Sequence, residues 1–399
     1  MKYDRYYLID NPFPKEAIID PFSDDKRVNG QIFNEELRQI HVNELKKRIN
    51  ERVNIIYVRA LTFEKGIGKS ALMCYVWREL QKRHEFATAF LKSTSKDTPD
   101  IIASNTIKSF HNDGYLWKAL KKCAFKYAES PEAQSIISRT ALENLLRSET
   151  MPQKIDLASY VFPPKTLTES FTEWLCRQIR MNYEVISGFV STYLSFPFHF
   201  LKQYDRLKKQ YEKLGRDPIE ELFKSMINFM HFSGFYCYVF IDQFEYIVGP
   251  LERSRKELAR FCNEMRRLLE ASAGKVTYIV SLHSEAHAIL TRYAECHYFR
   301  SVANPDTIRM IPDLERLGPD EAVKLAVTYL NHFRGEFTPP SPHFPFDKNS
   351  IYYICESRKG IPRFILEALY KAIEVGIKYD APSIDINFIK GHEKEILPE

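Results

Sequence analysis

The run Gly66-Ile67-Gly68-Lys69-Ser70 has the composition of a loop that binds phosphate groups. Glycines let backbone N–H groups approach phosphate oxygens, a lysine neutralises the terminal phosphates, and a serine hydroxyl binds Mg²⁺. The complete pattern G-x-x-x-x-G-K-[ST] requires a glycine at position 63, where this chain has Phe63. The run therefore predicts a nucleotide site that is intact from Gly66 onward, with a chance match in a basic chain as the alternative.

An aspartate at the end of an apolar stretch is the second candidate for the same chemistry. Asp242 follows FYCYVFI at residues 235–241, and a carboxylate in that position can hold Mg²⁺ directly or through its water shell. Gln243 comes next and could orient a water molecule, whereas Glu245 is the nearest acid that could act as a general base. The alternatives are an aspartate that begins a turn and a glutamate on the surface.

Three further polar residues stand at the ends of other predicted elements. Ser281 and His283 close the stretch KVTYIVSLH, and either could contact the attacking water or the γ-phosphate. Arg363 lies at a helix start, in GIPRF, where its cation could reach the γ-phosphate and couple nucleotide state to domain position. The alternatives are a structural histidine and a solvated arginine at a helix end.

These residues need a framework of strands and helices to bring them together. Residues 54–61 are short, β-branched and apolar, which predicts a buried strand, and residues 70–83 have the apolar spacing of a helix. Strand, glycine loop and helix follow one another in the order that a phosphate-binding loop requires. More strands are predicted at 86–91, 235–241, 275–282 and 307–311. Because helices alternate with them, we expect a parallel sheet covered on both faces.

The rest of the chain divides around this core. We expect an N-terminal segment over 1–50, a core over 51–94 and 231–315, and a helix-rich insertion over 95–230. Residues 316–399 have a helical pattern and predict a small C-terminal domain. Two portions of the insertion, 118–126 and 202–216, are basic and could contact phosphates of DNA, with solvated helix faces as the alternative.

In this order, the motifs EKGIGKS, YVFIDQFE, YIVSLHS and GIPRF resemble those of AAA+ ATPases. The resemblance is to the branch that holds origin-recognition ATPases, transposition-regulator ATPases and STAND signalling NTPases. It implies an α/β fold, with a P-loop parallel sheet flanked by helices (AAA+ type), a large helical insertion and a C-terminal helical lid. It also implies ATP and Mg²⁺ as ligands, with Ser70 and Asp242 at the metal.

The resemblance assigns roles to the remaining residues. It places the nucleotide against Glu64, Lys65, Gly66, Ile67, Gly68, Lys69, Ser70, Ala71 and Arg363. Asp242 and Glu245 take the Walker B role, Ser281 or His283 the sensor 1 role, and Arg363 the sensor 2 role. Arg292 and Arg300 become candidate arginine fingers that act on the nucleotide of a neighbouring copy. The stretch from Arg27 to Gly30 resembles the one that lies against the adenine.

Two functions are compatible with these motifs. The first is an ATP-binding switch ATPase that assembles with its own copies in a nucleotide-dependent way. It would recruit or regulate an effector protein through residues 95–230, on DNA, in transposition, replication or anti-phage defence. The second is a scaffold or adaptor that binds nucleotide without hydrolysing it, which the departures from the family pattern at Phe63 and Gln243 favour.

The composition argues against several other classes of protein, among them zinc-binding, disulfide-rich and membrane proteins. The 399 residues are 44% hydrophobic and 27% charged, enough for a substantial core, and the net charge of +5 is too small to imply a polyanion partner by itself. The seven cysteines form no C-x-x-C pair, which argues against a zinc site or a disulfide framework and favours the reducing cytoplasm. Residues 183–201 contain Glu184 and Pro197, so we expect a buried or interfacial helix there and no membrane partner.

Overall fold

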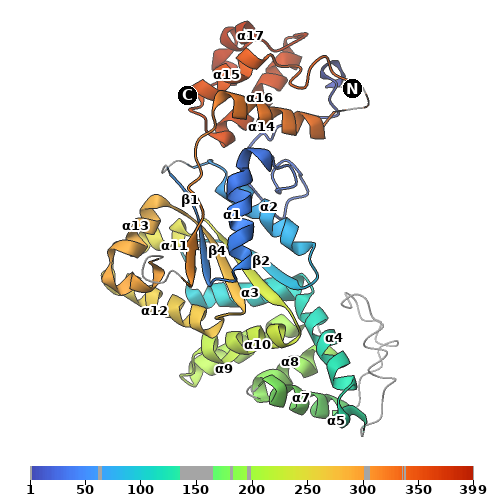
Figure 1. Cartoon of the computed structure of the whole chain (residues 1–399), viewed down its shortest axis with the longest axis vertical. Coiled ribbons are helices and arrows are strands. Elements are labelled where there is room, and N and C mark those ends of the chain that lie inside the picture. The colour runs from blue at the N-terminus through green and yellow to red at the C-terminus, as the bar shows by residue number, and fades with distance from the viewer. Residues whose placement is uncertain are drawn as a thin grey trace.

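The computed structural model of the chain describes residues 2–61, 65–134, 165–179, 183–195, 199–300, 306–334, 336 and 338–398. The molecule has three parts along its length (Figure 1). A helical domain from the C-terminal residues lies at one end, a sheet covered by helices lies in the middle, and helices from the centre of the sequence lie at the other end. Phe63 and Glu64, which precede the predicted phosphate loop, lie outside the described residues.

Five parallel strands form the sheet, in the order β2-β3-β4-β1-β5. They are β1 (Ile55–Ala60), β2 (Phe86–Lys92), β3 (Tyr236–Asp242), β4 (Val276–His283) and β5 (Ile308–Met310). The register places Ile56 of β1 opposite Ile279 of β4, and Val239 of β3 opposite Tyr278 of β4. All five predicted strands are present and every neighbouring pair is parallel, so the predicted α/β fold class is confirmed.

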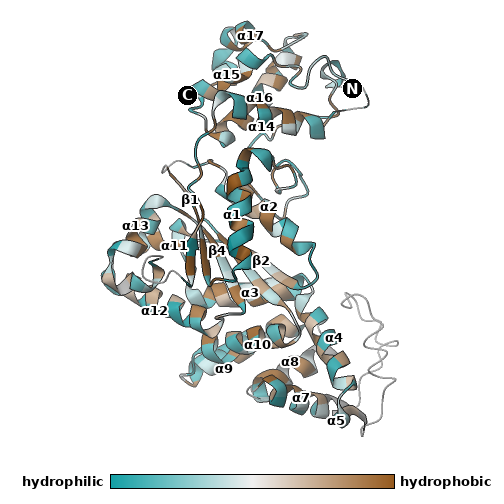
Figure 2. Cartoon of the chain, viewed as in Figure 1, coloured by the Kyte–Doolittle hydropathy of each residue, from teal (hydrophilic) through white to brown (hydrophobic). Residues whose placement is uncertain are grey.

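Alternate residues of each strand enter two different apolar cores, because successive side chains point to opposite faces of a sheet. On β1, Ile56 and Val58 pack with α1 (Gln39–Asn50) and α2 (Lys69–Gln81). Ile55 and Tyr57 join the core of the other face. That core also contains α11 (Glu245–Leu251), α12 (Arg255–Ala271) and α13 (Ser284–Arg292). Helices thus cover both faces, which explains why the strands are hydrophobic along most of their length (Figure 2).

The helices between β2 and β3 extend the second core. They are α3 (Pro99–Asn112), α4 (Tyr115–Ala128), α5 (Pro131–Gln134), α7 (Lys165–Ile179), α8 (Tyr183–Ser195), α9 (Phe200–Lys213), the π-helix η4 (Ile219–Phe223) and α10 (Lys224–Phe232). α3 contacts β2 and α10 contacts β3, while buried side chains of α4, α7 and α8 continue the same apolar cluster. The predicted insertion is therefore helical where the structure describes it, and its core is continuous with that of the sheet.

The stretch considered for a membrane span lies largely in α8. Val185, Ile186 and Phe189 of this helix are buried in the core shared with the sheet. Among the residues that the structure describes, no helix has both the length and the hydrophobicity to cross a membrane.

The C-terminal domain is built from α14 (Pro319–His332), α15 (Lys348–Ser357), α16 (Pro362–Lys378), α17 (Ile386–Gly391) and α18 (Glu393–Ile396). The first residues of the chain, including η1 (Asp4–Tyr6), pack into it, as the position of the N-terminus in Figure 1 shows. The Tyr6 hydroxyl donates a hydrogen bond to the carbonyl of Ala381 over 2.9 Å, and Leu8 and Phe13 are buried beside it. The chain then passes through η2 (Glu36–Arg38) into α1, so the N-terminal segment connects the two parts.

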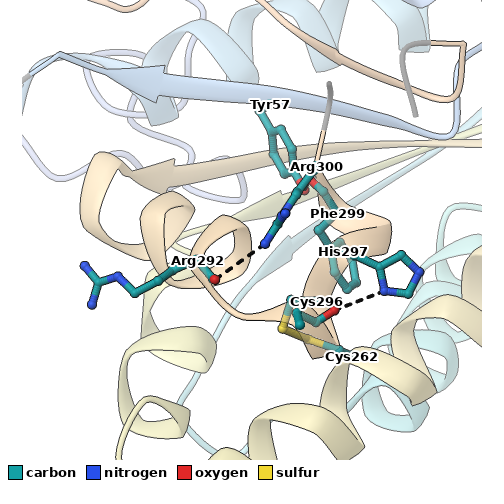
Figure 3. The surroundings of a disulfide bond; sticks show 8 residues. Tyr57, Cys262, Arg292, Cys296, His297, Phe299 and Arg300 are labelled. Atoms are coloured by element: carbon teal, nitrogen blue, oxygen red, sulfur yellow. Dashed lines mark hydrogen bonds between the residues drawn. A yellow bond between two sulfur atoms is a disulfide. The ribbon is translucent and has the colours of Figure 1, made fainter. Parts of the chain in front are cut away.

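Cys262 of α12 and Cys296 of η5 (Ala294–Phe299) form a disulfide bond, with their Cα atoms 5.6 Å apart (Figure 3). Both residues are buried. This pair corrects the expectation that the scattered cysteines form no disulfides. The two cysteines are 34 residues apart, and only the packing of η5 on α12 brings them together. The bond fixes the segment between Arg292 and Arg300 to α12.

Candidate functional site

The glycine loop lies at the carboxyl end of β1 and leads directly into α2. Gly66 and Gly68 have φ angles of +94° and +108°, in the region that favours glycine. Gly68 is the N-cap of α2, so the first N–H groups of the helix have no partner within it and can bind an anion. No atom lies within 4 Å of the place where a Cβ of Gly68 would be, whereas a Cβ on Gly66 would lie 2.6 Å from Cβ of Arg363.

These two glycines provide a matched test of the contact between the loop and the C-terminal domain. Gly68→Ala should cost about 1–2 kcal/mol of unfolding free energy, because only the backbone conformation becomes unfavourable. Gly66→Ala should cost about 1–3 kcal/mol more, because its methyl group also collides with Arg363. Urea denaturation of both variants measures the difference. The substitution Arg363→Gly removes the colliding Cβ and should recover part of it in the double variant, and equal stability of the two single variants would contradict this contact.

Asp242 ends β3 and is only 2% exposed. Its Oδ1 accepts hydrogen bonds from the Ser281 hydroxyl and from the backbone N–H of Gln243, and Ser70 also hydrogen-bonds to its side chain. Burial raises the pKa of Asp242, and these hydrogen bonds act against the increase. Ser281 also accepts from the Gln243 N–H over 2.9 Å. The Ser281 side chain is therefore used to orient Asp242 and the turn that follows it.

The turn after β3 places Glu245 at the site. Gln243 has a φ of +60°, an uncommon conformation for a residue with a side chain, and Glu245 is the first residue of α11. Glu245 Oε1 lies 3.0 Å from His283 Nε2 at the end of β4. Glu245 Oε2 is buried and has no hydrogen-bond partner among the described residues. One carboxylate oxygen is thus held by protein and the other is free.

Charges around Glu245 are closely spaced. Lys69 Nζ lies 3.4 Å from His283 Nδ1, on the side of the imidazole away from Glu245. Burial raises the pKa of Glu245, but its hydrogen bond to His283 and the nearby positive charge of Lys69 act against burial, and the net pKa is below the usual value. Burial lowers the pKa of the Lys69 ammonium, while the carboxylates of Glu245 and Asp242 oppose the decrease.

Arg363 approaches the loop from the first turn of α16. Its backbone N–H donates to the carbonyl of Gly66 over 3.2 Å. Its guanidinium Nε donates to Glu367 Oε1 over 3.0 Å, and the same oxygen accepts from the N–H of Ala17. The C-terminal domain, the N-terminal segment and the phosphate loop therefore meet at this residue.

A cavity of about 410 Å³ joins these groups at the carboxyl ends of β1, β3 and β4. The candidates from Lys65 to Ala71 line it, as do Asp242, Gln243, Glu245, Ser281, His283 and Arg363. Apolar side chains from the N-terminal segment and the C-terminal domain line it as well, among them Ile18, Ile32, Leu325 and Leu366. A volume of this size, lined by both polar and apolar groups, suits a nucleotide.

Sequence reasoning missed three polar residues that line the cavity. Arg38 donates to the carbonyls of Ile67 and Glu315 over 3.3 and 2.9 Å, so it fastens the loop. Tyr246 lies at the cavity beside Lys65, whose Nζ is 3.4 Å from its hydroxyl. Asn34 lines it from the N-terminal segment. None of the three belongs to a recognised motif. Tyr246 directly follows Glu245 in the sequence, and this position alone could have predicted that it lies at the site.

Arg27 was expected to lie at the adenine with the residues that follow it, and the structure separates this stretch. Arg27 lines the cavity, where its guanidinium pairs with Asp25 and Asp10 over 2.8 and 3.0 Å. The carbonyl of Asn29 instead accepts hydrogen bonds from α2, and a Cβ on Gly30 would lie 2.7 Å from the Cys74 sulfur. These later residues fasten the N-terminal segment to α2.

Arg292 and Arg300 do not line the cavity of their own chain. Arg292 is exposed, with its guanidinium 3.5 Å from Glu252, and the Arg300 guanidinium donates to the carbonyl of Arg292 (Figure 3). Both lie next to the disulfide-linked segment.

The residues present fit a magnesium-bound nucleoside triphosphate. The free Oε2 of buried Glu245 and the open space beside Gly68 can accept polar groups of a ligand. Ser70 and Asp242 offer oxygen atoms, which Mg²⁺ prefers. Among the described residues no three His, Cys, Asp or Glu side chains come together as a metal site. A cation held by Ser70 and Asp242 would therefore take its other ligands from phosphate and water.

The five-strand parallel sheet flanked by helices, with the glycine loop after β1 and Asp242 at the end of β3, is consistent with a P-loop fold of the AAA+ type. No family model and no curated protein matches the chain. Among solved structures it is similar to the Aeropyrum pernix ORC2 protein in ADPNP and ADP complexes, at 11% identity and a TM-score of 0.44, over 95% of this chain and 70% of that one. It is also similar to Drosophila ORC bound to DNA, at 11% identity and a TM-score of 0.39, over 100% of this chain and 65% of that one.

Proposed function

We propose that this protein binds ATP with Mg²⁺ in the cavity, hydrolyses it, and uses the bound nucleotide to control the position of its C-terminal domain. One observation carries the proposal: the glycine loop, Asp242, Glu245 and Arg363 line a single cavity although they are far apart in the sequence. Ligands of open parallel sheets bind at the carboxyl ends of the strands, which is where this cavity lies. A chance match of short motifs would not bring all four together there.

Each residue has a defined task in this proposal. The loop N–H groups and Lys69 bind the β- and γ-phosphates, and Ser70 and Asp242 hold the metal. When bound, Mg²⁺ neutralises charge on the phosphate oxygens. Glu245 lines the cavity and accepts the proton of the attacking water, while His283 holds its carboxylate through Oε1.

Arg363 links the nucleotide to the C-terminal domain. Its backbone already contacts the loop at Gly66, while its guanidinium is held by Glu367. A γ-phosphate near Gly66 offers a stronger anionic partner than one carboxylate, so the guanidinium would exchange Glu367 for the phosphate. The C-terminal domain would then sit differently with ATP than with ADP, which is the behaviour of a switch.

The proposal extends to assembly. Arg292 and Arg300 lie outside their own cavity, and an arginine of one copy could reach the phosphate of the next in a homo-oligomer. The helices of residues 95–230 project from the sheet at the end opposite the C-terminal domain, where an effector protein could bind (Figure 1).

Removal of the loop lysine tests the nucleotide site. Lys69→Ala should weaken ATP binding about 10- to 150-fold, because hydrogen bonds to charged groups contribute about 1.5–3 kcal/mol each. Calorimetry with a slowly hydrolysed ATP analogue and Mg²⁺ measures the affinity. Lys82→Ala is the matched control: Lys82 is exposed at the opposite end of α2, does not line the cavity and should leave the affinity unchanged. Unchanged affinity in Lys69→Ala would refute the assignment of this site.

DNA binding is a second candidate function, and the structure favours one of the two basic portions for it. On α9, the exposed residues Lys202, Arg206, Lys209 and Lys213 share one face and form no ion pair with a described residue. On α4, the ammonium groups lie over aromatic rings: that of Lys122 is 3.8 Å from the ring centre of Phe235, and that of Lys126 is 4.6 Å from that of Phe232. The α9 face is therefore the better candidate for phosphate contacts.

A further inference from the structure

One imidazole contacts both the phosphate-loop lysine and the candidate general base. His283 Nε2 is 3.0 Å from Glu245 Oε1, and His283 Nδ1 is 3.4 Å from Lys69 Nζ. The three side chains are largely buried, with 12% of His283, 16% of Glu245 and 8% of the Lys69 residue exposed. They come from three separate elements, α2, β4 and α11, and all line the nucleotide cavity.

The chemistry of the three groups fixes the direction of the two hydrogen bonds. Ionised Glu245 can only accept, so the proton of a neutral imidazole lies on Nε2 and is donated to Oε1. Nδ1 then has a free lone pair, and it accepts from the Lys69 ammonium, which can only donate. A doubly protonated imidazole would instead place an N–H against that ammonium. The neutral form with its proton on Nε2 is therefore the one that satisfies both neighbours.

We propose that His283 is a positioning residue that bridges Lys69 and Glu245, holding the lysine while the cavity has no nucleotide and orienting the carboxylate for hydrolysis. The inference rests on the proposed ATPase function and adds a means of regulation to it. Nucleotide phosphate competes with Nδ1 for the Lys69 ammonium, and the 3.4 Å contact is long enough to be exchanged readily. The bond to Oε1 persists and fixes the orientation of the Glu245 carboxylate beside the cavity that this residue lines.

Two conservative substitutions separate the two halves of this bridge. In His283→Asn, the amide oxygen stands close to the position of Nδ1, so the Lys69 contact can persist while the Glu245 contact is lost. In His283→Gln, the amide nitrogen reaches the position of Nε2, so the Glu245 contact can persist while the acceptor for Lys69 is lost. His283→Ala loses both contacts.

The rate constant kcat should depend on the contact between His283 and Glu245, and Kd should depend on the contact between His283 and Lys69. We expect kcat to fall about tenfold in His283→Ala and His283→Asn, and to remain within about threefold of the unchanged protein in His283→Gln. We expect Kd for a slowly hydrolysed ATP analogue to fall about two- to tenfold in His283→Ala and His283→Gln, since the lysine is no longer held, and to stay unchanged in His283→Asn. Steady-state phosphate release and calorimetry give the two values, and urea denaturation shows that each variant folds.

A uniform response would overturn the inference. If all three variants change kcat and Kd by the same factors, or change neither, His283 does not bridge Lys69 and Glu245 and has at most a structural role. The Lys69→Ala measurement keeps this outcome apart from a failure of the proposed function. Loss of binding in Lys69→Ala together with a uniform response at His283 rejects the bridge alone, whereas unchanged binding in Lys69→Ala rejects the nucleotide site itself.

Discussion

The Glu245→Gln variant should bind ATP as tightly as the unchanged protein and hydrolyse it about 10²–10⁴-fold more slowly, the range expected for loss of a general base. Glutamine has nearly the same size, and its amide oxygen can still accept from His283 Nε2, which lies 3.0 Å from Oε1. It has no carboxylate to take the proton of the attacking water. Steady-state phosphate release measures the rate, and calorimetry with an ATP analogue measures the affinity.

A matched control lies on the next helix of the chain. Glu257 is exposed in the first turn of α12 and does not line the cavity, so Glu257→Gln should leave the rate unchanged. If Glu245→Gln hydrolyses ATP as fast as the unchanged protein, another group is the base. If the unchanged protein binds ATP but releases no phosphate, the scaffold function suggested by Gln243 is the correct one.

The parts of this site that could be predicted are those with a local signature. The strands were visible because a strand buried on both faces is apolar along its whole length, as in FYCYVFI before Asp242. The loop could be predicted because glycine, lysine and serine occur at fixed spacing in phosphate-binding loops, and this chain has them at that spacing from Gly66 to Ser70. Since the carboxyl ends of parallel strands meet at one edge, residues that follow different strands converge, and Asp242 and His283 do so here.

The parts that escaped prediction depend on packing between distant segments. Arg38 lies in a short helix with no motif, and only the fold brings its guanidinium to the carbonyl of Ile67. The packing of Tyr6 and Leu8 into the C-terminal domain joins residues more than 300 positions apart, which no local pattern encodes. The disulfide between Cys262 and Cys296 likewise follows from the contact of α12 with η5.

Sequence reasoning also could not choose between Ser281 and His283. Both end the same strand two positions apart, so their side chains start on the same face of the sheet. The difference lies in what surrounds each one. The short side chain of Ser281 donates a hydrogen bond to Asp242, whereas the longer side chain of His283 reaches Glu245 and Lys69. Side-chain length and neighbouring elements decide the role, and neither is visible in a single strand pattern.

Neutralising the basic face of α9 should have the other large effect, on DNA affinity. The variant carries four substitutions, Lys202→Gln, Arg206→Gln, Lys209→Gln and Lys213→Gln. If each side chain neutralises one phosphate of duplex DNA, the slope of log K against log[salt] should become shallower by about 3.6, and affinity at about 0.15 M salt should fall about 10³-fold. Fluorescence anisotropy with a labelled duplex over a range of salt concentrations measures both quantities.

The control is a variant of α4, in which three lysines that lie over aromatic rings are replaced. The substitutions are Lys118→Gln, Lys122→Gln and Lys126→Gln. These lysines already have aromatic partners, so their loss should lower the free energy of unfolding by about 0.5–1 kcal/mol per contact and leave the salt slope unchanged. Equal weakening of DNA binding by both variants would show that charge in general, not the α9 face, attracts the duplex. Affinity that does not depend on salt would exclude phosphate contacts by either helix.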